Sequence, residues 1–376
     1  MRILLLGEYS NLHWTLAQGL LILGHEVCVI SDGDTWKGFK NDRSLKRKDN
    51  SAKEGLKYVL RLLSLLPKMR GYDVVQIINP IFLDLKADKN LIIYKYLRRN
   101  NKKVFLGANG VDHFWIKTCL DGKSFRYSDF DIFGKERMTD INKRMINEWI
   151  NSEKEQVNKY IAEDCNGITC CLYEYYKSYI DDYPEKTYFA PLPVEVAQID
   201  VDKMKRLEAY DYDLPEMKYK PLNIFIGIQK NRSSVKGTDI MDKVLKKLHS
   251  DYPDKFTVTR VESVPYYTYK ELLSQADVIL DQIYSYTPAM NALLAMSKGI
   301  IAVSGGEPEN YEIINEKEIF PIINVLPDED DIYNKLESLI LNPDVIGLLS
   351  HDSIAYVLKH HNNVDVAKRY LEIWEK

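Results

Sequence analysis

The segment Leu222–Leu248 reads LNIFIGIQKNRSSVKGTDIMDKVLKKL and joins an apolar strand pattern to a helical pattern. Between the two patterns lie three cations, Lys230, Arg232 and Lys236, together with small residues and Gly237. A strand that leads into a helix through a short polar turn is the repeating unit of parallel sheets covered by helices. The segment therefore predicts an α/β fold, and it marks one strand-to-helix turn as a candidate binding site.

The same alternation extends along the chain on both sides of this segment. Apolar runs predict strands at 1–7, 25–31, 73–78, 103–108, 167–172 and 188–193, and later at 222–228, 256–261, 278–283, 300–305 and 320–325. Helical patterns separate these runs, and 136–163 reads as one long polar helix. Buried parallel strands with intervening helices predict two doubly wound, Rossmann-like domains.

We expect an N-terminal domain over residues 1–197 and a C-terminal domain over residues 198–355, facing each other across a cleft. The tail, residues 356–376, carries a helical apolar stripe and is expected to pack back on the first domain. Ligands of doubly wound folds bind beyond the carboxyl ends of the strands. The two turn regions at these ends are therefore the places to look for function.

The overall composition is that of a globular protein. The chain has 376 residues, of which 45% are hydrophobic and 28% charged, and its net charge of -4 gives no support for nucleic acid as a partner. Five cysteines without a Cys-x-x-Cys spacing predict reduced thiols in a cytoplasmic protein. The sequence starts directly in a strand pattern, and no apolar run has the roughly 20 residues that a membrane span needs.

The cationic turn has the chemistry of an anion site. A helix amino end carries unpaired N–H groups and a partial positive charge, and it binds phosphate when it follows a strand. Arg232 adds a planar fork of donors and Lys236 a mobile ammonium group, which together suit a diphosphate. Gly237 would let the backbone approach such a ligand. The alternative is that these side chains are solvated loop cations, and no Walker A pattern is present.

These residues carry a resemblance to a known family. RSSVKGTDIM, starting at Arg232, resembles the Arg–Lys–Gly–x–Asp segment of GT-B glycosyltransferases of the GT4 type. QADVILDQIYSYTPAMNALLAMSKGIIAVSGGEPENYEII, starting at Gln275, and the first 31 residues resemble two further blocks of the same family. The resemblance spans most of the chain. It implies that Arg232 and Lys236 grip the diphosphate of a nucleotide-sugar donor.

The resemblance further implies transfer of a sugar to an acceptor hydroxyl with retention of anomeric configuration. The donor is then a substrate rather than a cofactor, and helix termini and cations take the place of a metal ion. Three other functions stay open: a non-catalytic nucleotide-sugar-binding protein, a GT-B epimerase, and a nicotinamide oxidoreductase. The last would need a Gly-x-Gly-x-x-Gly turn after the first strand, which is missing.

One departure from the family concerns its Glu–x7–Glu pair, which lies near the donor sugar and the ribose. Aligned on this pattern, Tyr286 and Leu294 stand where the two carboxylates are expected. Tyr286, Thr287 and Asn291 could supply hydroxyl and amide hydrogen bonds instead. The alternative is that these side chains only pack or cap the helix that follows.

Candidates in the first half of the chain follow its predicted strands. Ser10, Asn11 and His13 lie in the turn after the first strand, which in the resembling family faces the acceptor or donor sugar. Asn109, Asp112 and His113 follow the fourth strand, where the family places a polar residue near the reaction centre. Asp112 is the candidate base or sugar ligand, and His113 could serve either role. Helix capping by Ser10, Asn11 or Asp112 is the competing interpretation.

No metal site is predicted. Asp-x-Asp triplets occur at 32–34, 129–131 and 211–213, as chance alone would give in so acidic a chain. His360 and His361 are expected to be a surface pair rather than a zinc site.

The segment 43–70 is strongly basic and contains a helical pattern with Leu56, Leu60 and Leu63 on one side. A basic amphipathic helix can lie on anionic lipid, which would place the protein at the inner face of a membrane next to a lipid-linked or glycan acceptor. The competing interpretation is an ordinary helix whose leucines face the core.

Overall fold

A computed structural model describes residues 1–34, 37–209, 221–229, 233–264 and 266–376. The chain forms two compact units. The first consists of Met1–Ser124, Thr139–Glu195 and Asn363–Lys376, and the second of Phe125–Met138 and Val196–Asn362. The chain therefore enters the second unit twice, once briefly through residues 125–138.

The first unit is built on a parallel sheet of seven strands within the described residues, in the order β3-β2-β1-β4-β5-β8-β9. Its strands are β1 (Arg2–Leu6), β2 (Glu26–Ser31), β3 (Arg43–Ser44), β4 (Val74–Ile77), β5 (Lys103–Ala108), β8 (Gly167–Cys170) and β9 (Thr187–Phe189). The central strands are buried along nearly their whole length, as expected for a sheet covered on both faces.

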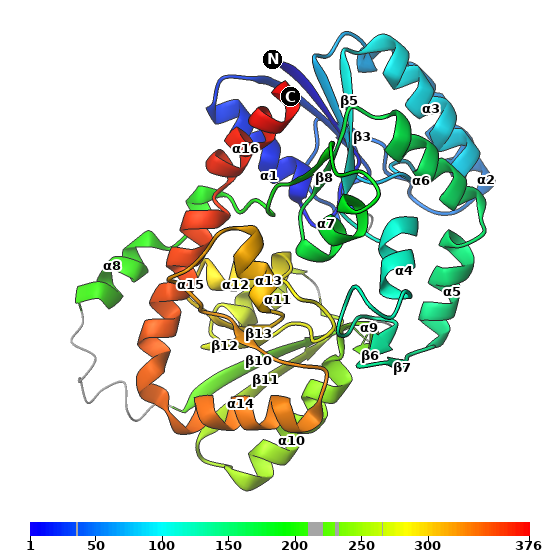
Figure 1. The fold of residues 1–376 in the computed structure, drawn as a ribbon. Coiled ribbons are helices and arrows are strands. Elements are labelled where there is room, and N and C mark those ends of the chain that lie inside the picture. Colours follow the sequence, from blue (N-terminus) through cyan, green and yellow to red (C-terminus); the bar gives the residue numbers. More distant parts are fainter. Residues whose placement is uncertain (35–36, 210–220, 230–232, 265) are drawn as a thin grey trace. The chain divides into compact units, whose positions relative to one another are not determined.

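The helices of the first unit connect these strands. They are α1 (Leu12–Ile22), α2 (Ala52–Leu65), η2 (Leu66–Met69), α3 (Ala87–Asn100), α4 (His113–Cys119), α5 (Asp140–Trp149), α6 (Glu153–Asp164), α7 (Tyr173–Ile180) and α16 (Asn363–Glu375). The carboxyl-terminal helix α16 lies along α1 (Figure 1), and one apolar core joins both helices to β1 and β2. Trp374 and Tyr370 supply the largest buried rings of this contact.

The second unit contains a parallel sheet in the order β11-β10-β12-β13-β14. Its strands are β10 (Leu222–Ile228), β11 (Phe256–Glu262), β12 (Val278–Leu280), β13 (Ile301–Ser304) and β14 (Ile323–Asn324). Its helices are η3 (Val196–Gln198), α8 (Val201–Ala209), α9 (Ser233–Lys236), α10 (Thr238–Asp251), α11 (Tyr266–Leu273), α12 (Met290–Met296), α13 (Pro308–Ile313), α14 (Glu329–Leu341), η5 (Pro343–Val345) and α15 (Ile346–His360). This sheet and the first confirm the prediction of two doubly wound α/β domains.

Each sheet has a point at which the order of the strands reverses. In the first sheet the chain leaves β1 toward β2 and later returns to the other side of β1 with β4. In the second sheet the chain leaves β10 toward β11 and returns to the other side of β10 with β12. Loops at such a point diverge above and below the sheet and leave a crevice at its carboxyl edge. Side chains in the connections that follow β1, β4, β10 and β12 are therefore the ones placed to contact a ligand.

Residues 125–138, which we call the arm, pack on the second unit although they lie in the first half of the chain. They form a short hairpin of β6 (Asp131–Ile132) and β7 (Lys135–Glu136), drawn beside α9 in Figure 1. Ile132 packs against the core of the second unit, and Arg137 donates a hydrogen bond to the carbonyl oxygen of Ser234 in α9. No local pattern in the sequence predicts this hairpin.

The predicted long helix over residues 136–163 is wrong, because two helices replace it. Helix α5 ends at Trp149, Asn151 takes a left-handed conformation with φ 53°, and α6 begins at Glu153. The side chain of Ser152 caps α6 by accepting a hydrogen bond from the amide of Glu155. The cap at Ser152 thus starts a new helix inside a polar run whose pattern alone would allow one continuous helix.

The expectation of a surface pair at His360 and His361 is also wrong. His361 is buried, and the Nε2 atom of His360 lies 2.5 Å from a carboxylate oxygen of Glu316. Glu316 is itself buried and accepts hydrogen bonds from the amides of Lys317, Glu318 and Ile319. Burial alone would raise the pKa of Glu316, but the hydrogen bonds from His360, from these amides and from Lys359 outweigh it and hold the pKa well below its usual range.

The low pKa of Glu316 predicts a loss of stability in acid. A carboxyl group with a folded-state pKa below its unfolded value stabilises the fold above about pH 4.3, and the contribution disappears as the pH falls toward the folded-state pKa. Glu316→Gln should lower the free energy of unfolding by about 1–3 kcal/mol at neutral pH and flatten its slope in acid. Urea unfolding at several pH values measures both. Glu318→Gln, at an exposed neighbouring position, should change neither; equal effects of the two variants would contradict the assignment.

Candidate functional site

The reversal point of the second sheet carries an ion pair between Lys236 and Asp281. Lys236 is the last residue of α9, in the connection that follows β10, and Asp281 comes directly after β12. The Nζ atom of Lys236 lies 2.8 Å from Oδ1 of Asp281, with 29% of the lysine side chain exposed but only 1% of the aspartate side chain. The predicted strand 278–283 in fact ends at Leu280, which frees Asp281 to turn toward the lysine.

Two further polar side chains extend this pair. The amide nitrogen of Asn291, in α12, lies 3.1 Å from the same Oδ1 atom of Asp281. The hydroxyl of Tyr269, in α11, donates to the amide oxygen of Asn291 over 3.0 Å. Oδ2 of Asp281 is buried and has no hydrogen-bond partner among the described residues. Buried carboxylate oxygens are normally satisfied, so this one indicates a place where a ligand or water completes the group.

The chemistry of the pair depends on the number of donors that lysine carries. An ammonium group has three N–H donors, and the contact with Asp281 uses one of them. The remaining donors of Lys236 can reach a bound anion, because part of its side chain is exposed. Asp281 thus fixes the direction of the ammonium group, while its negative charge weakens the attraction that the lysine exerts on an anion.

Glycines are required at two positions of this edge by contacts within the protein. Gly237 has a left-handed φ of 71°, and a Cβ atom there would lie 2.3 Å from the side chain of Ile283. A Cβ atom at Gly305, which follows β13, would lie 1.9 Å from the carbonyl oxygen of Ser285. Close packing of the connecting turns therefore explains both glycines, and for Gly237 it adds a reason that the sequence did not reveal.

Tyr286 and Thr287 take part in contacts of the connection after β12. Tyr286 is buried, its hydroxyl accepts a hydrogen bond of 2.5 Å from the backbone amide of Arg126 in the arm, and burial raises its pKa to about 12. The guanidinium of Arg126 also lies over its ring, 4.8 Å from the centroid. Thr287 is buried, and its carbonyl oxygen accepts a hydrogen bond from the hydroxyl of Ser285. Leu294, at the other aligned Glu position, is half-buried in α12.

Glu307, which no sequence pattern singled out, also connects the arm to the rest of the second unit. Glu307 is buried just after Gly305–Gly306, where it pairs with Arg126 at 2.7 Å and accepts a hydrogen bond of 2.7 Å from Tyr127. Arg126 also reaches Glu309. No pattern in the sequence links Arg126 to a glutamate so far along the chain, so only the fold shows that they meet.

Among the predicted cations of the turn, only Lys236 can be located. Arg232 and Lys230 lie outside the described residues, so their part in the anion site stays a prediction from the sequence. Asp211–Asp213 also falls outside them. Of the other two triplets, Asp34 accepts a hydrogen bond from the amide of Ser10, and Asp131 accepts one from the amide of Gly134 in the arm. Among the described residues, no group of three or more His, Cys, Asp and Glu side chains is arranged to hold a metal ion.

The turn after β1 is organised by Glu8, which sequence reasoning missed. Its carboxylate accepts hydrogen bonds from the amides of His13 and Trp14 and so caps α1, while burial raises its pKa to about 8. Ser10 and Asn11 have left-handed φ angles of 54° and 67°, and the Asn11 side chain makes no capping bond. Two consecutive non-glycine residues with left-handed backbone angles raise the conformational energy of the turn. Such backbone strain is typical of functional turns.

His13 and Asn109 have buried polar atoms without a partner. His13 donates from Nδ1 to the carbonyl oxygen of Gly7, so its Nε2 is an unpaired acceptor, and burial lowers its pKa to about 4. Asn109 follows β5 directly, and both polar atoms of its buried side chain lack a hydrogen-bond partner among the described residues. Because β1, β4 and β5 are neighbours, both residues belong to the carboxyl edge of the first sheet. Unpaired groups there fit hydroxyls of a bound substrate.

Asp112 and His113 are held by internal hydrogen bonds instead. Asp112 caps α4 by accepting from the amide of Trp115 and also accepts from the hydroxyl of Tyr179, and burial raises its pKa to about 6. The backbone amide of His113 donates to Asn158, and its Nδ1 donates to the carbonyl oxygen of Trp149. The Nε2 atom of His113 is buried and unpaired, and burial lowers the pKa of this imidazole. A catalytic role for either residue remains a prediction.

The ion pair between Lys236 and Asp281 should contribute to the stability of the fold. Lys236→Met would leave Asp281 buried without its counter-charge, which should lower the free energy of unfolding by about 1–3 kcal/mol, less than for a fully buried pair because Lys236 is partly exposed. Adding Asp281→Asn should restore most of this loss. Urea unfolding of both variants gives the comparison.

The control is Lys243→Met, whose pairing with Glu329 on the surface should contribute less than about 1 kcal/mol. A Lys236→Met variant as stable as this control would show that Asp281 needs no partner.

Comparisons with known proteins concern the fold. No protein-family model and no curated protein sequence matches the chain. Solved structures do match over its whole length. Sucrose-phosphate synthase from Thermosynechococcus elongatus has a TM-score of 0.57 at 11% identity, covering 100% of this chain and 98% of that chain. HepE from Anabaena, solved with UDP and glucose, has a TM-score of 0.58 at 10% identity, covering 99% of this chain and 98% of that chain.

An epimerase is also among the matching structures. UDP-GlcNAc 2-epimerase from Neisseria meningitidis, bound to UDP-GlcNAc, has a TM-score of 0.52 at 12% identity, with 99% of both chains covered. At these identities the likeness shows the fold and leaves the reaction open. The two Rossmann-like units of this chain therefore form a GT-B fold, which is shared by glycosyltransferases and by this epimerase.

Proposed function

We propose that the protein is a glycosyltransferase that moves a hexosyl group from a nucleotide-diphosphate donor to an acceptor hydroxyl. The observation that carries this proposal is Lys236, a cation held by Asp281 at the reversal point of the second sheet. The GT-B structures solved with UDP or a UDP-sugar support the choice of donor class. The donor serves as a substrate, so no cofactor is needed.

In the proposed reaction the second unit takes the charge of the leaving group. The bond between the anomeric carbon and the diphosphate breaks, the acceptor oxygen bonds to that carbon, and the hydroxyl proton passes to a base or to the departing phosphate. Lys236 and Arg232 would stabilise the diphosphate as its negative charge grows, which is electrostatic catalysis without a metal ion. Asn291 and Gly237 lie beside Lys236, whereas Tyr286 and Thr287 shape the connection after β12. The transfer is expected to retain the anomeric configuration.

The first unit would bind the sugar hydroxyls or the acceptor. His13 and Asn109 have unpaired polar atoms for this purpose. The strained residues Ser10 and Asn11 form the turn after β1, and the amide of Ser10 holds this turn by donating a hydrogen bond to Asp34. Asp112 is the candidate base, because a carboxyl group with a pKa near 6 is poised to exchange a proton at neutral pH. His113 is the candidate residue for orienting either Asp112 or a bound substrate.

The acceptor class proposed from the sequence is a glycan or a lipid-linked sugar, as in the synthesis of surface polysaccharides. Such an acceptor would place the protein in the cytoplasm, at the inner face of the membrane. Along the described part of the chain, no helix has both the length and the apolar content that crossing a bilayer requires. Any contact with lipid through the basic segment 43–70 would then be peripheral.

Two alternatives share the fold. A non-catalytic nucleotide-sugar-binding protein is favoured by Tyr286 and Leu294 at the positions where the resembling family carries glutamates. An epimerase is favoured by the match to the Neisseria enzyme. Both alternatives keep the donor site of the second unit and differ from transfer only in what happens to the sugar.

Thermal unfolding with UDP, GDP, ADP and CMP sugars tests the donor site. Ligands that bind only the folded state raise its apparent stability, and one donor class should raise the midpoint by at least about 2 °C. Arg232→Ala, and the pair Lys236→Met with Asp281→Asn, should each abolish the shift. The matched control Lys243→Met should keep it. A full shift in the Arg232 and Lys236 variants would remove the phosphate assignment.

The products then separate the three functions. With donor and acceptor present, a transferase releases free nucleoside diphosphate and a glycosylated product. An epimerase changes the donor sugar without releasing free diphosphate during its cycle, and a binding protein leaves the donor intact. Chromatography of the nucleotides over time distinguishes these results, and an intact donor with every acceptor class tried would contradict transfer.

Because the side-chain amide of Asn109 has no hydrogen-bond partner among the described residues, we predict that removing it lowers activity but leaves stability nearly unchanged. Asn109→Ala loses no internal hydrogen bond that the structure shows, so the free energy of unfolding should stay within about 1 kcal/mol of the wild type. Loss of a substrate hydrogen bond should lower kcat/KM about five- to tenfold. The control is Asn158→Ala, because Asn158 bonds both His113 and Tyr179 and should destabilise the fold. A destabilised Asn109→Ala with normal kcat/KM would assign Asn109 to structure.

A further inference from the structure

Helix α2 in the first unit is apolar on two opposite faces. Tyr58, Leu62 and Leu65 are buried and attach the helix to its unit. On the other side Leu56 is 63% exposed, Leu60 57% and Leu63 55%, and Val59 between them is 38% exposed. The interpretation that these leucines face the core is therefore wrong. We call these four residues the apolar stripe.

The apolar stripe is continuous along the helix. Its members are spaced as i, i+3, i+4 and i+7, which places them on one face over two turns. Scattered exposed leucines are ordinary on protein surfaces, but a contiguous row marks an interaction site. Pro67 follows one turn after Leu63 in η2 and is also exposed, so the exposed surface continues past the end of α2.

The segment 43–70, which contains the apolar stripe, carries an excess of positive charge. Lys57 pairs with Glu54, and Arg47 pairs with Asp84. The other basic residues from 43 to 70 form no ion pair with any described residue; they are Arg43, Lys46, Lys48, Lys53, Arg61, Lys68 and Arg70. In a chain whose net charge is -4, this local excess is not an effect of composition.

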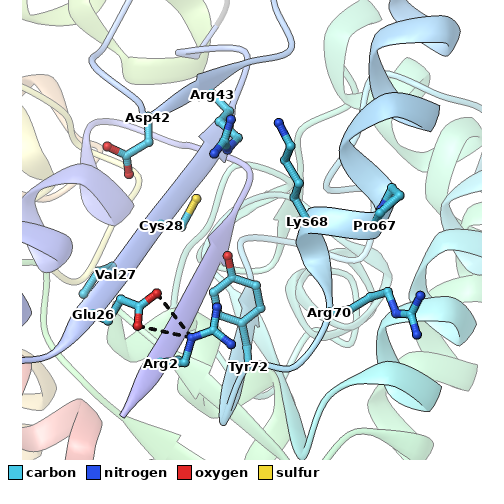
Figure 2. A pocket seen from close by; sticks show the side chains of 10 residues that line it. All are labelled: Arg2, Glu26, Val27, Cys28, Asp42, Arg43, Pro67, Lys68, Arg70 and Tyr72. Atoms are coloured by element: carbon cyan, nitrogen blue, oxygen red, sulfur yellow. Dashed lines mark hydrogen bonds and ion pairs between the residues drawn. The ribbon is translucent and has the colours of Figure 1, made fainter.

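A hollow of about 550 Å³ opens where η2 ends, and its lining includes Pro67, Lys68 and Arg70. Figure 2 shows Arg43, from β3, and Lys68, from η2, on either side of this hollow, with the ring of Tyr72 below them. The two carboxylates of the lining have other contacts. Glu26 pairs with Arg2, and Asp42 accepts the amide of Val29. Three cations thus remain available to an anion in the hollow.

We propose that this face binds an anionic phospholipid bilayer, with the apolar stripe inserted among the acyl chains. The unpaired cations would contact lipid phosphates, and the hollow would receive the phosphate of one headgroup between Arg43 and Lys68. Helix α2 has 14 residues and would lie parallel to the bilayer, as amphipathic helices do at such interfaces. Exposed leucines flanked by unpaired lysine and arginine are what an anionic lipid surface recognises.

A second copy of the chain is the main competing occupant of the apolar stripe. A twofold dimer through this face would bring the unpaired cations of one copy toward those of the other. Within the hollow, Glu26 is paired with Arg2, and Asp42, which accepts the neutral amide of Val29, is outnumbered by Arg43, Lys68 and Arg70, so the repulsion would remain. Charge complementarity therefore favours lipid. The proposal goes beyond sugar transfer and does not require it, since lipid binding can be measured without donor or acceptor.

Co-sedimentation of the full chain with lipid vesicles tests the proposal. Binding should occur on vesicles of phosphatidylglycerol and phosphatidylcholine and be absent on pure phosphatidylcholine. Raising the salt from about 0.1 M to about 0.5 M should weaken it, because exposed charges are then screened. Absence of wild-type binding to the anionic vesicles would overturn the proposal.

Variants separate the apolar stripe from the cations. The triple change Leu56→Gln, Leu60→Gln and Leu63→Gln should lower the partition coefficient at least tenfold. Ile92→Gln, at a position that is 56% exposed on α3, is the matched control and should leave binding unchanged. Because all four positions are exposed, circular dichroism should show the same fold for both variants. Unchanged binding of the triple leucine variant would overturn insertion of the stripe.

The triple change Arg43→Gln, Lys68→Gln and Arg70→Gln should also lower partitioning at least tenfold. Lys117→Gln with Lys143→Gln and Lys205→Gln removes three exposed lysines outside the face and should have little effect. Two results would replace lipid by another occupant. One is a wild-type dimer that the leucine variant converts to a monomer without any vesicle binding. The other is stabilisation by soluble glycerol phosphate that requires Arg43 and Lys68, again without vesicle binding.

Discussion

The contact between Lys236 and Asp281 is the interaction on which the proposed function depends. It joins the connections that follow β10 and β12, the two neighbouring strands between which the second sheet reverses its order. A buried carboxylate is stable there only with a counter-charge, so the fold itself holds a cation at the position where doubly wound sheets bind ligands. The donors that Lys236 does not use for Asp281 are what make an anion site of a structural ion pair.

The arm explains why a tyrosine at position 286 is compatible with the GT-B fold. The Tyr286 hydroxyl accepts a hydrogen bond from the backbone of Arg126, while the Arg126 side chain pairs with Glu307. A glutamate at position 286 would add a third carboxylate to Glu307 and Glu309 around one guanidinium. The carboxylates of this region therefore serve to attach the arm. In the proposed donor site, the contacts that the resembling family makes with a glutamate would come from Lys236, Asn291 and backbone groups.

Most of the fold could be predicted from local patterns, whereas much of the site could not. Short apolar runs identified the strands of both sheets except the two-residue strand β3, because each pattern lies within one element. The break at Ser152 was present in the sequence as Ser-Glu-Lys-Glu, a capping signal that the polar periodicity around it obscured. Asp281, Glu307 and Glu8 were missed because their partners lie in other elements. Lys236, His13 and Asn109 were predicted because they lie in the connections that follow strands, where the topology gathers polar groups.

The most direct measurement is a structure of the protein determined with UDP bound. We predict that diphosphate oxygens lie within hydrogen-bond distance of Nζ of Lys236, at the carboxyl edge of the second sheet, with Asp281 still in contact with the same lysine. A nucleotide bound elsewhere, or a diphosphate that makes no contact with Lys236, would contradict the proposed donor site.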